Sequence, residues 1–458
     1  MSQSTPLKAS DWHSIRNVYI QLAAVLCCVL FSSDAFGQAG RNSNTGLFEF
    51  VSPRLKIISD IPIDAELSSW PSLLDQAINH WKEFFGVPTM DSDKFSATVY
   101  VIRDLNNFQR HGLLDGVPAF DEGYQFGDRL FLREQPSIYY RRHLFLHEAT
   151  HWIMWHIYGG CGSPWYMEGM ADMQGTHSLG DGVKGNDSLG NGRLRLGIIP
   201  GSPLQVPYWG RLKKIHETME EGTAPSLAQI LAYENDRDRT IRYSWSWAAC
   251  VFFANHPKFG PILHQVRGNK MDYSDSLSRR LRASIGNAWE EACIDWNGFI
   301  SDLEFGYDPQ RSMVLSGEPT SAKPFKANTS FALATDHGWQ PTGIQVDAGQ
   351  SIRIVCSGRY RIRDNATAGQ VLSDRDWESE PQGITIEYFR GLPLGCVVAT
   401  IQSAAGNQST HRWEPIRIGR DATIDSKSSG VLYLKINEPS GRLSDNSGRI
   451  DVKIMIPK

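Results

Sequence analysis

The chain has 458 residues, 41% of them hydrophobic, and a formal net charge of −4 at pH 7. This length favours two domains after processing, and the hydrophobic content is sufficient for packed cores. A charge so close to zero, without a long basic run, gives no electrostatic field that would attract nucleic acid or an anionic membrane, so we expect neither as a partner.

Residues 1–37 are typical of a secretory signal peptide. Lys8 and Arg16 precede an apolar stretch over 18–31, and small residues follow at cleavage-site spacing. The stretch is shorter than the ~20 residues that span a bilayer, and no later segment is long and apolar enough to do so. We expect cleavage, with an uncleaved anchor as the alternative. The mature protein should then be secreted, periplasmic or on the cell surface, without a membrane span.

Residues 38–308 are predicted to form the first domain, which begins with a strand, a helix and a second strand. Residues 54–60 and 97–102 are rich in β-branched and aliphatic residues, as strands are. Residues 67–85 have the apolar periodicity of a helix and end at Gly86.

Residues 147–151 read H-E-A-T-H, within an apolar segment over 139–158 that contains neither Pro nor Gly. Helical residues four apart share a face, so His147 and His151 are predicted to bind one metal ion. Glu148 is adjacent to the first ligand, where its carboxylate can hold a metal-bound water, as in zinc hydrolases. Buried His and Glu side chains need partners, and a metal supplies them.

A second helix is predicted from Pro164, since Pro is favoured in a first helical turn. Glu168 and Asp172 then share a face. We expect Glu168 to be the third metal ligand, which leaves a fourth position open. Asp172 is expected to accept a hydrogen bond from the far nitrogen of a ligand histidine. The alternative is an amphipathic helix with solvated acids, but its many Trp, Tyr and Met residues leave little of it for solvent.

The H-E-A-T-H sequence, followed by Glu168 and then Asp172 one turn later, resembles the gluzincins, the thermolysin-like clan of zinc metallopeptidases. The stretch W-Y-M-E-G-M-A at 165–171 is similar to the W-x-x-E-G-x-A signature of the bacterial peptidase-MA-like proteins. The resemblance covers roughly 50–305 and implies a thermolysin-like zincin catalytic domain that binds Zn²⁺.

The resemblance also implies positions for other elements of the domain. Residues 127–132 would form the edge strand that lies beside the metal in this clan and aligns an extended peptide. Residues 243–248 and 288–300 would form the helices of its second half.

A zinc hydrolase needs a donor for the oxyanion of the transition state. In the gluzincins this donor is often a Tyr or His from the second half. Tyr243 is the first candidate here, ahead of His256 and His216. The alternative is a tyrosine that only packs within its helix.

Residues 309–334 are rich in Pro, Gly, Ser and Thr and are predicted to be a linker. Residues 335–458 then contain short alternating segments separated by Gly- and Pro-rich turns, which predict an all-β sandwich that is able to fold alone. The expected fold class of the chain is α+β. Cys356 and Cys396 are predicted either to form a disulfide or to be two buried thiols.

Residues 434–448 resemble the calcium loop of bacterial galactophilic lectins, and the similarity extends over about 335–458. The resemblance implies that Glu438, Asp445 and Asn446 supply oxygen atoms to Ca²⁺. Glu438 stands where that family usually has the shorter Asp. The alternative is a turn held by Asx hydrogen bonds, without a cation.

These patterns predict a secreted zinc metallopeptidase that hydrolyses peptide bonds through a zinc-activated water, with Glu148 as general base and a C-terminal carbohydrate-binding-like module. Its partners would be a peptide or protein substrate and a carbohydrate. One alternative is hydrolysis of a non-peptide amide or ester at the same metal. The other is a carbohydrate-binding surface protein whose zincin domain is inactive.

Overall fold

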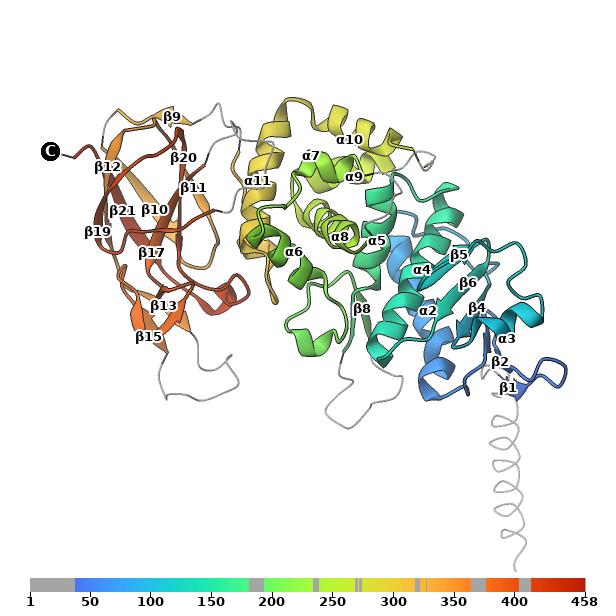
Figure 1. The fold of residues 1–458 in the computed structure, drawn as a ribbon. Coiled ribbons are helices and arrows are strands. Elements are labelled where there is room, and N and C mark those ends of the chain that lie inside the picture. The colour runs from blue at the N-terminus through green and yellow to red at the C-terminus, as the bar shows by residue number, and fades with distance from the viewer. Residues whose placement is uncertain are drawn as a thin grey trace, which may run out of the picture. The chain divides into compact units, whose positions relative to one another are not determined.

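The computed structural model describes residues 38–180, 193–233, 239–267, 271, 274–317, 322–326, 328–363, 376–402 and 413–457. The signal peptide predicted for 1–37 lies outside these residues. Helices and several sheets give a mixed α/β architecture that is compatible with the expected α+β class (Figure 1). The described chain divides into two compact units, one made of 38–75 and 90–134 and the other of the remaining residues. No helix in the described ranges is both long and apolar enough to cross a bilayer.

The first unit is built on one six-stranded sheet. Its strands are β1 (Gln38–Arg41), β2 (Phe48–Val51), β3 (Leu55–Ser59), β4 (Ala97–Ile102), β5 (Gly123–Phe126) and β6 (Arg129–Arg133). Helix α2 (Ala65–Phe84) begins in this unit, and α3 (Leu105–Arg110) follows β4. The strand order is β1-β2-β3-β4-β6-β5, in which β3, β4 and β6 run parallel. The strand, helix and strand predicted over 54–102 are confirmed by β3, α2 and β4.

The prediction that 127–132 form an edge strand is wrong. Strand β6 lies inside the sheet, paired in parallel with β4 and antiparallel with β5. The three residues of β6 from Leu130 to Leu132 are fully buried, a continuous apolar run that is typical of a strand covered on both faces. The edge position belongs to β5.

The second unit begins with a group of helices. They are α4 (Ile138–Tyr158), α5 (Pro164–Gly175), α6 (Arg211–Glu220), α7 (Leu227–Leu231), α8 (Arg239–Asn255), α9 (Phe259–Arg267), α10 (Ser276–Ile285), α11 (Trp289–Asp302) and α12 (Pro309–Ser312). A short hairpin, β7 (His177–Leu179) with β8 (Leu194–Leu196), lies between α5 and α6 in the chain. Helix α8 contacts α5, α6, α7, α9 and α11 and is buried along 244–253 (Figure 1). Helices α8 and α11 confirm the two predicted for the second half.

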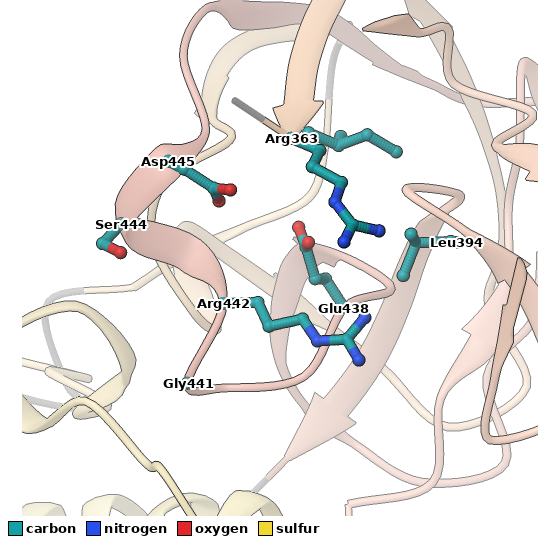
Figure 2. A pocket seen from close by; sticks show the side chains of 8 residues that line it. Arg363, Leu394, Glu438, Gly441, Arg442, Ser444 and Asp445 are labelled. Atoms are coloured by element: carbon teal, nitrogen blue, oxygen red, sulfur yellow. The ribbon is translucent and has the colours of Figure 1, made fainter. Parts of the chain in front are cut away.

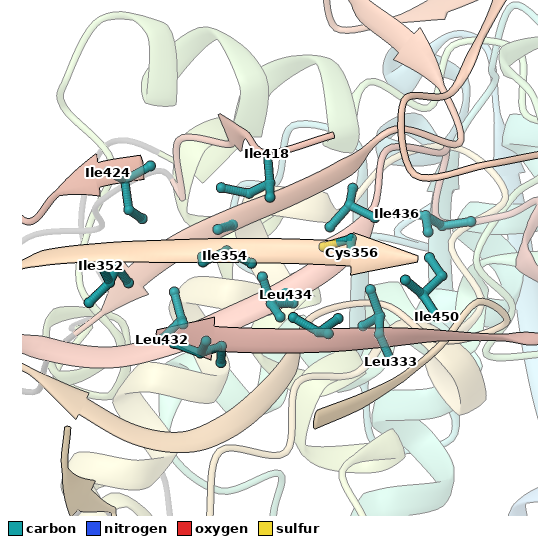
Figure 3. Packing of buried hydrophobic residues seen from close by; sticks show 14 of the residues in the cluster. Leu333, Ile352, Ile354, Cys356, Ile418, Ile424, Leu432, Leu434, Ile436 and Ile450 are labelled. Atoms are coloured by element: carbon teal, nitrogen blue, oxygen red, sulfur yellow. The ribbon is translucent and has the colours of Figure 1, made fainter. Parts of the chain in front are cut away.

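The C-terminal part of the second unit consists of strands. They are β9 (Lys323–Pro324), β10 (Thr329–Ala334), β11 (Gln340–Val346), β12 (Ser351–Ser357), β13 (Tyr360–Arg363), β14 (Trp377–Ser379), β15 (Ile384–Phe389), β16 (Leu392–Leu394), β17 (Val397–Gln402), β18 (Ile416–Arg417), β19 (Asp421–Asp425), β20 (Gly430–Ile436) and β21 (Arg449–Met455). One sheet has the order β10-β21-β12-β19 and another the order β18-β17-β20-β11-β9. Alternate residues of both sheets share one apolar core (Figure 3). Cys356 and Cys396 are buried and not bonded to each other.

The interpretation of 309–334 as a linker fails for its last six residues. They form β10, which pairs with β21 from Thr329 opposite Ile454 to Ala334 opposite Arg449. Leu333 is buried and Phe331 packs against the same core, so only two inward-facing residues mark this strand in the sequence. Its strand structure depends on pairing with a segment more than a hundred residues away.

Helix α11 packs on the five-stranded sheet and shares an apolar cluster with it, which includes Ile294 of the helix and Val398, Val431 and Tyr433 of the sheet. At the end of this helix the buried carboxylate of Asp302 contacts Lys435 Nζ at 2.5 Å and Arg390 Nη1 at 2.9 Å. The acidic partner of buried Lys435 therefore lies outside 335–458, which argues against the expectation that residues 335–458 fold on their own.

The Asp302–Lys435 pair gives a test of this packing. Lys435→Met should lower the free energy of unfolding by about 3 kcal/mol, because removing one member of a buried ion pair leaves the other poorly compensated. The matched control is Arg353→Met, which removes an exposed pair with Asp421 and should cost far less, because solvent screens exposed pairs. Chemical denaturation followed by tryptophan fluorescence measures both. Equal losses would contradict the buried packing of α11 on the sheet.

Candidate metal centre

Helix α4 carries the H-E-x-x-H sequence into the interior. It begins after Ser137, whose hydroxyl accepts a hydrogen bond from the backbone N–H of Tyr140, and it ends at Gly159, with a φ of 71°. All residues from 143 to 154 are buried, as expected for a helix that is apolar all round. The three polar residues of the motif are therefore removed from water on a rigid element.

The structure brings together the three residues predicted to bind a metal. His147 Nε2 lies 3.2 Å from His151 Nε2, and Glu168 Oε2 lies 3.3 Å from the first and 3.6 Å from the second. Zinc–ligand bonds of about 2.0–2.2 Å place neighbouring ligands of a tetrahedron about 3.3–3.6 Å apart. The spacing of these donor atoms therefore fits one four-coordinate ion with a remaining open position.

Helix α5 delivers Glu168 to this site. Pro164 occupies its first turn, as predicted. The next residue after Glu168 is Gly169, where a Cβ atom would lie 2.2 Å from the backbone oxygen of Ser246 on α8. Any side chain at position 169 would push the two helices apart. The absence of a side chain thus lets α5 and α8 touch backbone to backbone, which fixes the position of the Glu168 carboxylate.

The electrostatics of the site favour a positive charge between these side chains. Burial would raise the pKa of Glu168, but hydrogen bonds with His147 and His151 hold it well below its ordinary value. Burial would likewise lower the pKa of His151, but its contacts with Cys161 and then Glu168 raise it well above the ordinary range. A carboxylate held ionised against two imidazoles is a suitable environment for a metal cation.

Glu148 differs from Glu168 in its surroundings. It is 5% exposed, and burial raises its pKa although the two neighbouring histidines act in the opposite direction. A buried carboxylate with a raised pKa binds a proton more readily than a solvated one. This is the property required of a group that accepts a proton near neutral pH.

Asp172 was predicted to contact a ligand histidine, and it lies one helical turn beyond Glu168. Its Oδ1 is 4.0 Å from His147 Nδ1, which is longer than a hydrogen bond. Its close partners are His143 Nε2 at 2.9 Å and Arg211, whose Nε and Nη2 donate at 2.5 and 3.0 Å. Burial raises the pKa of Asp172, but Arg211 and His143 together lower it well below the ordinary value.

Sequence reasoning missed His143 and Arg211. His143 had a local signal, because it lies one helical turn before His147 and on the same face. Arg211 begins α6, 39 residues after Asp172, and no spacing rule connects the two.

His143, His147 and Asp172 form a second group whose donor atoms are close enough to hold a metal ion. In this group both oxygens of Asp172 already accept hydrogen bonds from Arg211. The guanidinium charge would repel a further cation. The group with Glu168 is therefore the better candidate for a metal.

Tyr243 lies near the proposed ligands, at the start of α8. Its ring centroid is 6.2 Å from that of His147 and 5.7 Å from the guanidinium carbon of Arg211. The two rival donors are engaged elsewhere. His256 Nε2 contacts the buried Asp295 at 3.1 Å, and His216 Nε2 contacts the backbone oxygen of Leu303 at 2.8 Å.

Of the three residues predicted to bind calcium, Glu438 and Asp445 line a pocket of about 290 Å³ (Figure 2). Glu438 is 2% exposed, and burial raises its pKa to about 8. The Asn446 amide donates to Glu438 Oε2 at 2.7 Å and to the backbone oxygen of Thr335 at 2.9 Å, whereas its Oδ1 is buried without a hydrogen-bond partner among the described residues. An unpaired oxygen beside a buried carboxyl group fits a hard cation. Asp445 lines the same pocket.

The contacts of Asp172 give a prediction. Arg211→Met should weaken the binding of zinc, used as a probe ion, by ~10–100-fold, the range for residues that orient metal ligands. The reason is that Asp172 loses its bidentate partner and no longer has a fixed position beside His147. The control is Lys213→Met, on the same helix, where the side chain is 82% exposed and affinity should not change. Titration against a competing chelator measures both. Wild-type affinity in Arg211→Met would contradict the orienting role.

The raised pKa of Glu438 gives a second prediction. The unfolded chain loses this proton near pH 4.5 and the folded chain near pH 8, so the folded state binds more protons in between. The contribution of Glu438 to stability is then complete below about pH 4.5 and is lost as the pH rises to about 8. In calcium-free buffer, the difference in melting temperature between Glu438→Gln and wild type should therefore shift in favour of the variant over this range. A difference that does not vary with pH would contradict the raised pKa.

No protein-family model matches the sequence, and no curated protein shows significant similarity to it. Among solved structures, the chain is similar to the EclA N-terminal domain, a PllA-like lectin, with 19% identity and a TM-score of 0.21, covering 28% of this chain and 95% of that one. IMPa from Pseudomonas aeruginosa in complex with an O-glycopeptide matches with 11% identity and a TM-score of 0.15, and the match covers 51% of this chain and 24% of that one. IMPa metallopeptidase in complex with T-antigen matches with 12% identity and a TM-score of 0.17, and the match covers 80% of this chain and 37% of that one. The chain thus spans well under half the length of the IMPa structures. Similarity at this level assigns neither a family nor a function to the chain.

Proposed function

We propose that this chain is a secreted zinc metallopeptidase of the gluzincin type. The observation that carries the proposal is the arrangement of His147, His151 and Glu168, whose donor atoms are spaced like three corners of a zinc tetrahedron. The catalytic region would be a thermolysin-like zincin domain over 38–308, preceded by a signal peptide over 1–37. Two imidazoles and one carboxylate with an open position are the ligand set of catalytic rather than structural zinc sites.

When bound, zinc would polarise the carbonyl group of the substrate and lower the pKa of a water molecule towards neutrality. Glu148 would accept a proton from the attacking water and later donate it to the leaving amine. Its burial and its position next to His147 support this role. Tyr243 would donate its hydroxyl hydrogen to the developing oxyanion, since its ring lies beside that of His147.

Asp172, held by Arg211 and His143, would restrict the position of the His147 ring. The 4.0 Å between Asp172 Oδ1 and His147 Nδ1 is close enough for an electrostatic contact.

The C-terminal residues would form a lectin-like β-sandwich that binds carbohydrate with the help of Ca²⁺. The two sheets around one core support the sandwich, and the pocket lined by Glu438 and Asp445, with Asn446 hydrogen-bonded to Glu438, supports a cation site. A peptide or protein that carries glycans would use both parts of the chain.

The alternative is a carbohydrate-binding surface protein whose zincin domain is inactive or acts on a non-peptide bond. The pocket at Glu438 is the observation that favours a binding role. Release of peptide fragments from a casein substrate, measured beside model esters and amides with and without a chelator, separates the three functions. Chelator-sensitive peptide hydrolysis supports the metallopeptidase, and its absence in the zinc-loaded protein would contradict it.

Two substitutions should separate metal binding from catalysis. Glu148→Gln should keep one zinc per chain but lose more than ~99% of the hydrolysis, because the amide has the shape of the acid but cannot accept the proton. His147→Ala should lose the zinc as well, since two ligands cannot close the site. Metal analysis of the purified variants and their turnover check both. Near wild-type turnover in Glu148→Gln would exclude it as the base, and full zinc retention in His147→Ala would exclude the ligand assignment.

A further inference from the structure

The pocket at Glu438 carries two arginines that a site for a cation alone would not need. Arg363 ends β13 and Arg442 follows β20, and both side chains line the pocket together with Glu438 and Asp445 (Figure 2). Cations repel one another, so guanidinium groups beside a cation site lower its affinity unless they serve another ligand. Two such groups point to a pocket that binds more than a metal ion.

The two arginines differ in their partners. Arg442 Nη1 donates to Glu387 Oε1 at 2.5 Å, so its charge is compensated. Arg363 forms no ion pair with any residue that the structure describes. Its guanidinium carbon instead lies 4.7 Å from the centroid of the Trp377 ring. The two residues are directly opposite each other on the paired strands β13 and β14, so the ring restricts the arginine without neutralising it.

The charges that remain decide what the pocket attracts. Neighbouring ion pairs such as Arg361–Asp376 are neutral in sum. Among the described lining residues, this leaves the carboxylates of Glu438 and Asp445 and the guanidinium of Arg363. Because the raised pKa of Glu438 keeps its carboxyl group protonated in the empty pocket, the net charge of this group is then 0, and a bound divalent cation that displaces this proton would change it to +1. The loaded pocket would attract an anion, whereas the empty pocket would not.

We propose that this pocket binds an acidic saccharide, which would place hydroxyl groups on the cation and a carboxylate or sulfate group on Arg363. The proposal rests on the carbohydrate-binding function proposed above and specifies the ligand class of the same pocket. Arg363 would be the residue that determines specificity, since a planar guanidinium forms two parallel hydrogen bonds with such an anion. The pocket volume of about 290 Å³ suits one sugar ring.

The test uses calorimetric titration of the full chain with galactose, galacturonic acid and galactose 6-sulfate, which differ in one substituent. In 150 mM salt with Ca²⁺, at least one acidic sugar should bind roughly 10-fold or more tightly than galactose, the usual gain from a hydrogen bond to a charged group. Which acid binds better distinguishes a carboxylate from a sulfate site. Removing Ca²⁺ with a chelator should abolish the preference.

Arg363→Gln should bring the three sugars to within about twofold of one another, and Arg363→Lys should keep part of the preference because it retains the charge. Arg359→Met, which removes an exposed pair with Glu378, is the control and should leave the preference unchanged. Melting curves establish that each variant is folded. An acidic preference that survives in Arg363→Gln, or equal binding of the three sugars by wild type, would overturn the proposal and leave the lectin function standing. Failure of all three sugars to bind would overturn both.

Discussion

Buried carboxylates that need an opposite charge constrain the whole second unit. Each of them pairs with a group on another element, so charge as well as packing fixes the relative positions of the helices and strands. Glu168 on α5 meets two histidines of α4, and Asp172 meets Arg211 of α6. Asp302 at the end of α11 meets Lys435 on β20. A buried carboxylate without such a partner is costly, so a shift of one helix would break several of these contacts at once.

These pairs differ in what they leave unsatisfied. Asp172 and Asp302 each have two cationic or hydrogen-bonding partners and are electrostatically complete. Glu168 faces two imidazoles that carry a full positive charge only when protonated, and Glu438 faces a neutral amide. A metal ion is proposed at both Glu168 and Glu438.

The sequence predicted those parts of the site that lie within one helix. His147, Glu148 and His151 are on α4, and Glu168 and Asp172 on α5, so helical spacing alone brings each set onto one face. Arg211 could not be predicted, because its contact with Asp172 joins two helices through tertiary packing. Strand β10 was missed for a similar reason, since its structure depends on pairing with β21. The edge strand was misplaced because the clan's arrangement was carried over, although the buried run at Leu130 indicated an interior strand.

The contact at Gly169 has a consequence for how this site responds to its environment. Where side chains separate two helices, these side chains can repack. The distance between the helices then varies with temperature, pressure and substitutions. Where two backbones touch, no side chains lie between them, so the spacing of α5 and α8 is set by atomic radii. The carboxylate of Glu168, one residue earlier in the chain, is therefore attached to a rigidly placed backbone. Changes at neighbouring core positions therefore leave the spacing of α5 and α8 unaltered, whereas a single methyl group at position 169 would push the two helices apart and displace the Glu168 carboxylate from the histidines.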